Sequence, residues 1–305
     1  MLNNEQFKNF CEKINMNPEA LVEINELFAE EIFSKIKARY TGFSELFIAD
    51  RNEYYVKEKE FADELGVDFS VLNLFLYINF ANEAKTKFDE KGIDDKIYYD
   101  TFRDVANCAE LYRNSSGKLG LDEMWLNWLQ LHVRFMIFRI GRLQFEFRPL
   151  KEDIPLYLTQ SGAFAPTKSG NREVLTNGAF NLAVHIPRYL KLYHEECIDA
   201  YKNAKVFFKK HFDRDVLFCT CSSWLISPQL RLWLGEDSNI IKFQNDYVLI
   251  NEFASEGTIS FLFGTKQENP DDYPEDTSLR RKVKEFIKSG GTLTAGYGVL
   301  SMVNL

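Results

Sequence analysis

The first 140 residues carry apolar side chains at intervals of three and four, the spacing of one face of an α-helix. The pair Asn17–Pro18 is typical of a helix start, and the stripe behind it predicts a helix that ends near Gly42. Further helices are expected over 70–91, 95–112 and 121–136. The first stripe consists of Leu21, Ile24, Leu27, Phe28, Ile32 and Ile36. The front of the chain is therefore predicted to be helical.

The period changes at residues 141–149, GRLQFEFRP, where apolar and polar side chains alternate as in a half-buried strand. Strands and helices then interleave, which predicts an α/β layer with a mixed sheet. The two runs after residue 239 are interpreted as antiparallel strands around the turn ASEG. The expected elements are strands over 181–187, 215–226, 240–253 and 258–264, and helices over 194–212, after Pro228, and from Thr277 or Ser278 to Gly290, with TAGYGVL (294–300) closing the chain.

These patterns predict two domains in a chain of 305 residues, which is long for a single core. The first, over 1–120, is mainly helical, and the second, over 121–305, is a mixed-sheet α/β domain, so the fold class is α+β / α/β. The net charge of −8 lies in the first domain, where 23 acidic residues face 15 basic ones, while 121–305 holds 22 of each. An acidic front argues against nucleic acid as a partner, and the neutral back is the better host for an anionic ligand.

The number of cysteines and the hydropathy of the chain indicate in which cellular compartment the protein is expected. Five cysteines, an odd number in a large chain, favour reduced thiols over a disulfide framework. The N-terminal stretch MLNNEQFKNFCEK has no basic segment followed by an apolar run, so no signal peptide is expected. No window is long and apolar enough to suggest a membrane span. A cytoplasmic protein without a membrane partner is predicted, and its oligomeric state is left open.

Several short strings in a fixed order resemble a known family. The chain is similar to the bacterial two-domain acyltransferase-domain-containing proteins, which have an N-acyltransferase-like N-terminal domain and a GNAT-like C-terminal domain. The resemblance runs from about Trp125 to the C-terminus and is weaker before it. The strings are RIGRLQFE (139–146), VHIP (184–187), CSSWLISPQL (221–230), SNIIKFQ (238–244), DTSLRR (276–281) and GYGVL (296–300).

The resemblance implies an acyl-CoA co-substrate and transfer of its acyl group to a small amine. The strand ending at Ile186 would separate from the strand ending at Ser222, and the pantetheine arm would lie between them. The loop over 187–194 would hold the pyrophosphate at a helix N-terminus. The residues expected to bind the co-substrate are Ile186, Pro187, Arg188, Lys191, Ser222 and Ser223.

The loop itself departs from the GNAT pattern, and this supports an alternative. Glycines normally let such a loop approach phosphate oxygens closely, but PRYLKLYHEE contains none. Glu195 and Glu196 stand in the first helical turn, where their charge would repel phosphate. Arg188 and Lys191 could offset this. The alternative is a catalytically altered relative that binds another small molecule or a protein partner.

Three residues are candidates for catalysis. His185 could take a proton from the amine, since imidazole titrates near neutral pH, or it could be an ordinary strand histidine with a structural partner. Glu146, beside arginines on the strand 142–148, could activate the amine through water or form a structural ion pair. Cys221 could be a nucleophile, and a hydrolase using Cys221 or His185 is a third hypothesis, although buried apolar cysteines are commoner.

No metal site is predicted. Cys219 and Cys221 alternate on one strand without a nearby second pair of His or Cys ligands, which makes a poor zinc site. The acidic run over 267–276 lacks the glycine-centred pattern of a calcium loop and is interpreted as a solvated loop with a helix cap.

Overall fold

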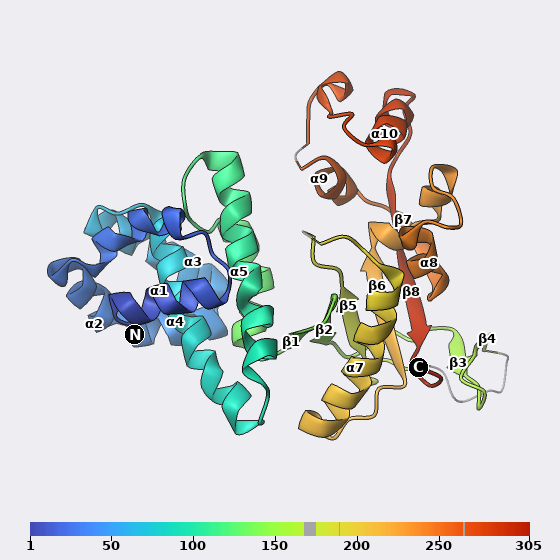
Figure 1. Cartoon of the computed structure of the whole chain (residues 1–305), viewed down its shortest axis with the longest axis horizontal. Coiled ribbons are helices and arrows are strands. Elements are labelled where there is room, and N and C mark those ends of the chain that lie inside the picture. The colour runs from blue at the N-terminus through green and yellow to red at the C-terminus, as the bar shows by residue number, and fades with distance from the viewer. Residues whose placement is uncertain (168–174, 189, 265) are drawn as a thin grey trace. The chain divides into compact units, whose positions relative to one another are not determined.

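The structure is a computed structural model, and it describes residues 1–167, 175–188, 190–264 and 266–305. The contacts between Cα atoms divide the chain into two compact units, Met1–Ile140 and Gly141–Leu305. The first is helical and the second is built on a mixed sheet, which confirms the predicted fold class (Figure 1).

The first unit consists of helices and one terminal strand. Its elements are α1 (Asn4–Lys13), η1 (Pro18–Phe28), α2 (Glu30–Ala49), α3 (Arg51–Leu65), α4 (Phe69–Glu90), α5 (Asp95–Ser116), η2 (Glu123–Trp125), α6 (Leu126–Val133) and β1 (Ile137–Ile140). The middle helix, α4, is buried around most of its circumference. Asp68 begins α4 by accepting a hydrogen bond from the Ser70 backbone at 2.9 Å, and Asp94 begins α5 in the same way through Lys96 at 2.7 Å.

The helix predicted to end near Gly42 runs further. The segment after Pro18 is a 3₁₀ helix that ends at Phe28, and α2 then continues through Gly42 to Ala49. Among the described residues outside the backbone of α2 itself, no heavy atom lies within 4 Å of the place where a Gly42 Cβ would be, so this glycine neither turns the chain nor packs closely against another element. It only weakens the helix by about 1 kcal/mol relative to alanine. Asp50 ends α2 and caps α3.

The segment 121–140 folds with the helical unit, so the compact units divide later than the boundary at residue 120 expected from sequence. Tyr77 of α4 donates a hydrogen bond to the Leu129 carbonyl of α6 at 3.0 Å. Trp128 Nε1 donates to Asp104 Oδ2 at 2.8 Å, and the buried His132 ring lies 3.3 Å from the same oxygen. These buried polar contacts hold α6 against α4 and α5.

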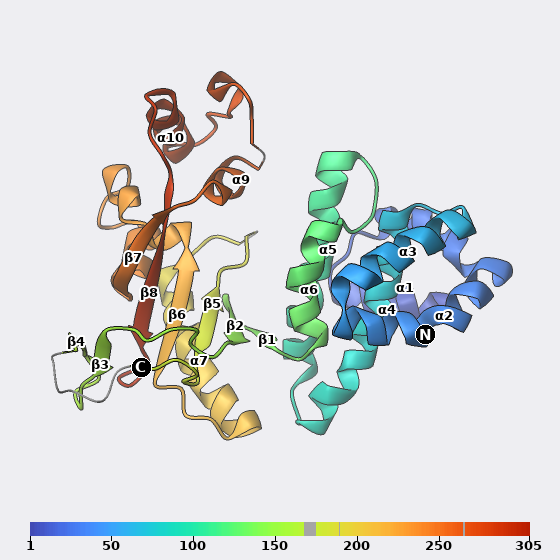
Figure 2. The same ribbon diagram turned by 180° about the vertical axis from the view of Figure 1, so that it is seen from behind.

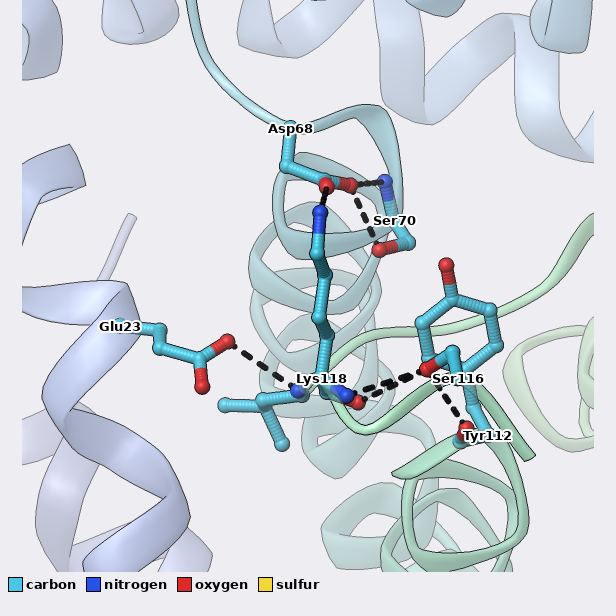
Figure 3. Close-up of polar contacts among 7 residues, drawn as sticks. Glu23, Asp68, Ser70, Tyr112, Ser116 and Lys118 are labelled. Atoms are coloured by element: carbon cyan, nitrogen blue, oxygen red, sulfur yellow. Dashed lines mark hydrogen bonds and ion pairs between the residues drawn. The ribbon is translucent and has the colours of Figure 1, made fainter. Parts of the chain in front are cut away.

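A polar cluster fastens the loop between α5 and α6 to the start of α4 (Figure 3). Asp68 accepts from the Ser70 hydroxyl at 2.7 Å and pairs with Lys118 Nζ at 3.3 Å. The Leu119 backbone donates to Glu23 of η1 at 3.1 Å. A single loop is thereby joined to two helices that are distant in sequence, and each group at these helix ends gains a partner.

The second unit holds a sheet with strand order β2-β5-β6-β8-β7, in which only β5 and β6 run parallel. Helix α7 packs on one face, where Phe208 meets Phe147 of β2 with ring centroids 4.9 Å apart (Figure 1 and Figure 2). The elements are β2 (Leu143–Phe147), β3 (Leu156–Leu158), β4 (Phe164–Pro166), β5 (Leu182–His185), α7 (His194–Phe212), β6 (Phe218–Ser223), η3 (Trp224–Ile226), η4 (Pro228–Leu232), α8 (Asn239–Asn245), β7 (Val248–Ala254), α9 (Gly257–Phe263), η5 (Pro270–Asp272), α10 (Ser278–Lys288) and β8 (Thr294–Ser301).

Of the two strands predicted after residue 239, the first is right only in its second half and the second is wrong. Residues 239–245 form α8, whose start is capped by the Ser238 hydroxyl, and residues 257–263 form α9. Only 248–254 is a strand, β7. The run after Gly257 is short and apolar, so its periodicity cannot separate a strand from a helix. Packing stabilises the helical conformation of this run, because Leu262 and Phe263 form a buried cluster with Val283 of α10.

Glycine in β8 lets η3 lie directly on the sheet. A Cβ at Gly296 would stand 2.7 Å from the Ile226 carbonyl oxygen, and one at Gly298 would stand 3.3 Å from the Ile226 side chain. Glycine in a strand commonly marks such a close backbone approach. The string GYGVL therefore has a packing role in this unit.

We expect Gly296→Ala to lower the free energy of unfolding by about 1–3 kcal/mol, because the added methyl group would push η3 off β8. Urea denaturation followed by circular dichroism measures this. Gly257→Ala is the matched control, since its Cβ would meet nothing closer than 3.9 Å. Equal stability of the two variants would contradict the packing role.

Candidate active site

The parallel strands β5 and β6 separate before either of them ends. Their pairing joins Leu182 to Cys219 and Ala183 to Thr220, and no later pair occurs among the described residues of the two strands. Beyond that point β5 stays paired with β2 as far as His185, and β6 stays paired with β8 as far as Ser223. The facing edges are therefore open towards their carboxyl ends, in agreement with the separation expected from the resemblance.

A glutamate–histidine pair stands beside this opening. The register of β2 and β5 places Gln144 opposite His185 and Glu146 opposite Ala183, so Glu146 and His185 are diagonal neighbours. His185 Nε2 lies 2.8 Å from Glu146 Oε2, and Arg148 Nη1 lies 3.7 Å from the same oxygen. The Glu146 side chain is 9% exposed and the His185 side chain 27% exposed. The carboxylate is thus shielded while the ring reaches solvent.

This pair fixes the chemistry available to His185. An ionised carboxylate only accepts hydrogen bonds, so the bond to Glu146 places the imidazole proton on Nε2. Nδ1 then carries the lone pair that could take a proton from a substrate. The same bond stabilises the imidazolium that would form, as in other catalytic carboxylate–histidine pairs. Sequence spacing could not reveal the pair, because its two members lie 39 residues apart.

The loop between β5 and α7 covers residues 186–193, and its Tyr189 lies outside the described residues. Arg188 Nη2 donates to the carbonyls of Ser260 and Phe261 at 3.0 and 3.3 Å, in the last turn of α9. Arg188 therefore caps a helix C-terminus, a different use from the predicted contact with a phosphate. Pro187 is buried and Ile186 half-buried, while the Lys191 side chain is exposed.

The N-terminus of α7 combines a missing side-chain cap with charged neighbours. Its N-cap residue, Tyr193, makes no side-chain capping bond. The His194 backbone donates to Asn239 of α8 at 3.3 Å, and the His194 ring lies 2.9 Å from Asp246 Oδ1. Burial raises the pKa of the Asp246 carboxyl, and the contact with His194 offsets part of that rise. The side chains of Glu195 and Glu196 are exposed, and their charge still opposes an anion here.

The two serines after Cys221 have different surroundings. Ser223 accepts a hydrogen bond from the Leu225 backbone at 3.1 Å and so caps η3. Ser222 is exposed and pairs through its backbone with Tyr297 of β8. Of the two, only Ser222 offers a side chain without a capping role next to the open edge of β6.

Cys221 is enclosed in the core. It is 1% exposed, and burial raises the pKa of its thiol to about 12. A nucleophilic cysteine needs an accessible group that ionises near neutral pH. Both properties argue against the predicted nucleophile, and Cys221 takes no part in the function proposed below.

We expect native protein to resist iodoacetamide at Cys219 and Cys221, because burial suppresses the thiolate of both residues. Mass spectrometry of peptides after labelling near pH 8 measures this, with labelling in urea as the control that shows both thiols can react. Cys221→Ala should keep its acyl-transfer rate within about twofold. Rapid native labelling together with loss of turnover would instead favour a cysteine mechanism.

A mixed sheet whose two parallel strands, β5 and β6, are joined by a helix and separate towards their carboxyl ends is typical of a GNAT-like domain. Two family models match the chain: the GNAT-like C-terminal domain over residues 137–300 and the N-acyltransferase N-terminal domain over residues 5–135. The chain belongs to this two-domain N-acyltransferase-like family. No curated protein matches it.

Solved structures with the same fold are acyltransferases. One is described as an acyltransferase in complex with decanoyl-CoA and teicoplanin; it has a TM-score of 0.75 and 18% identity, with 99% of this chain and 89% of that chain covered. A second, in complex with CoA and 10C-teicoplanin, has a TM-score of 0.74 and 18% identity, covering 98% and 88%. At 18% identity the likeness shows the fold alone.

Within the described residues, no helix has the length and hydropathy of a membrane span.

Proposed function

We propose that the protein is an acyl-CoA-dependent N-acyltransferase. The observation that carries this proposal is the interrupted pairing of β5 and β6 beside Glu146 and His185. The pantetheine arm has backbone-like amide groups, which match the unpaired edge groups of two separated strands. The α7 N-terminus, with no side-chain cap, lies one loop away and suits a pyrophosphate. Membership of the family supports the same co-substrate.

One proton would pass from the amine to His185 and from there to the leaving thiolate. The acceptor amine attacks the thioester carbonyl carbon while His185 Nδ1 takes a proton from the nitrogen, and Glu146 stabilises the resulting imidazolium. The carbon–sulfur bond then breaks, leaving an amide and a CoA thiolate. The proton held by His185 returns to that thiolate, so the histidine ends neutral. A backbone N–H on the open edge of β5 or β6 would polarise the carbonyl.

The acceptor is proposed to be a small amine. The related structure contains teicoplanin, so an amine on a larger scaffold is the variant of this proposal that the relatives favour. All five cysteines are buried free thiols, the form that a reducing compartment preserves, and this supports a cytoplasmic location.

Calorimetry with acetyl-, octanoyl- and decanoyl-CoA tests the co-substrate. We expect saturable binding of at least one acyl-CoA with weaker binding of the matching free fatty acid. A thiol-release assay with a panel of primary amines then tests transfer, and mass spectrometry of the product identifies an amide. Absence of binding at millimolar acyl-CoA would refute the proposal.

A second candidate is a relative that binds an acyl-CoA-like ligand or a protein partner without transfer. The position of Arg188 favours it, because this loop cation is already engaged with α9, and so do the exposed Glu195 and Glu196. Binding of acyl-CoA without thiol release in the presence of any amine would select this candidate.

A further inference from the structure

Arg142 holds the backbone of the loop between β5 and α7. This buried residue, 4% exposed, precedes β2. Its Nε donates to the Lys191 carbonyl at 2.9 Å, and its Nη2 donates to the Leu190 carbonyl at 2.6 Å. Two consecutive carbonyl groups therefore face the same guanidinium. Such a paired contact is stronger and more directional than one from a lysine.

The planarity of the peptide bond extends this observation to the N–H groups. In a trans peptide the carbonyl of one residue and the N–H of the next point in opposite directions. Because the carbonyls of Leu190 and Lys191 face Arg142, the N–H groups of Lys191 and Leu192 both point away from it. Neither donates a hydrogen bond to another described residue. Successive N–H groups on one side of the chain form a concave site for an anion.

The positive charge of the Arg142 guanidinium lies close to the first turn of α7. The pKa of the Cys197 thiol, at the end of the first turn, is raised to about 12 by burial, and the nearby positive charge of Arg142 counteracts part of that rise. A buried cation therefore lies behind the loop, where it opposes the charges of Glu195 and Glu196.

We infer that Arg142 is a positioning residue that orients the loop amides towards the pyrophosphate of the co-substrate, in place of the glycines that this loop lacks. The inference rests on the proposed acyl-CoA binding. It explains how a loop without glycine presents two adjacent N–H groups on one side: the orientation is imposed by an arginine that directly precedes β2. It also gives a role to this buried arginine.

The test compares two thioesters, decanoyl-CoA and S-decanoyl-pantetheine, which lacks the pyrophosphate. We expect Arg142→Met to weaken decanoyl-CoA binding by about ten- to a hundredfold in calorimetry, because the two loop amides are no longer fixed. Binding of S-decanoyl-pantetheine should stay within about twofold. Arg142→Lys, which keeps the charge and one donor, should lose less affinity than Arg142→Met and covers the case in which the methionine variant fails to fold.

Lys205→Met is the matched control. Lys205 also donates to backbone carbonyls of this unit, those of Met302, Val303 and Leu305 at 2.6, 3.4 and 2.9 Å, but none of these belongs to the loop. We expect it to bind both thioesters like the wild type. Equal losses for the two thioesters in the Arg142 variants, or no loss for decanoyl-CoA, would overturn the positioning role. Failure of the wild type to bind either thioester would refute the proposed function itself.

Discussion

Replacement of His185 by alanine is expected to reduce kcat for acyl transfer by about 10²- to 10⁴-fold, the usual contribution of a positioned general base. In the proposed mechanism the ring supplies the nitrogen that accepts the amine proton, and its 2.8 Å contact with Glu146 orients the ring. The affinity for decanoyl-CoA should change little, because that ligand is proposed to bind to the backbone edges and the α7 N-terminus. Stopped-flow thiol release and calorimetry measure the two quantities separately.

Two further variants make this result specific. Glu146→Gln should lower kcat by a smaller factor than His185→Ala, and the double variant should be no slower than His185→Ala alone, because the carboxylate acts through the histidine. His211→Gln, near the end of α7, is the histidine control and should transfer at the wild-type rate. A His185→Ala protein with full kcat would exclude the pair from catalysis.

Glu58 of α3 has the second largest expected effect, on stability. Its side chain is fully buried, and neither carboxylate oxygen makes a hydrogen bond within the described part of the chain. Burial raises the pKa of Glu58 well above its ordinary range, and the neighbouring Tyr54 hydroxyl offsets only part of this. The folded protein therefore keeps a proton that the unfolded chain releases.

The direction of the pH dependence follows from that proton. The stabilising contribution of the neutral carboxyl is fully present below the ordinary glutamate pKa and is lost as the pH rises towards the raised value, by about 1.4 kcal/mol per pH unit. As the pH rises from 5 to 7 we expect the wild type to lose stability relative to Glu58→Met, which has similar volume and no charge. Urea denaturation of both proteins at each pH measures the difference.

Glu58→Gln is the second variant, because it keeps the shape and removes the titration. Its stability relative to Glu58→Met should be constant over this range. A wild-type curve parallel to that of Glu58→Met would mean that the carboxyl titrates normally and is not buried in solution.

Local patterns were sufficient for much of the fold. Helix α7 occupies the predicted 194–212, because a stripe of buried side chains such as Cys197, Tyr201 and Phe208 repeats along it. The alternation in β2 also identified its strand correctly. Helices α8 and α9 were both predicted as strand, because a short apolar run acquires its conformation from its neighbours, which for α9 are the residues of the cluster around Val283.

The sequence suggests candidate site residues one by one, but it does not show which of them are in contact. Glu146 and His185 were both candidates, yet only the register of β2 with β5 makes them partners. Arg142 gave no signal beyond a polar strand face, because its role depends on two carbonyls 48 and 49 residues further along the chain. Arg188 appeared suited to phosphate because sequence does not show that the end of α9 lies beside it. Long-range contacts decide each of these roles.

Amide hydrogen exchange with and without decanoyl-CoA examines the strand opening most directly. Saturating ligand should slow exchange at residues 184–186, at the end of β5 and just after it, and at 221–223 of β6, with the central pairs at Ala183 and Thr220 unchanged. Ligand bound by calorimetry that leaves both edges exchanging at their original rates would place the thioester arm elsewhere and contradict the account.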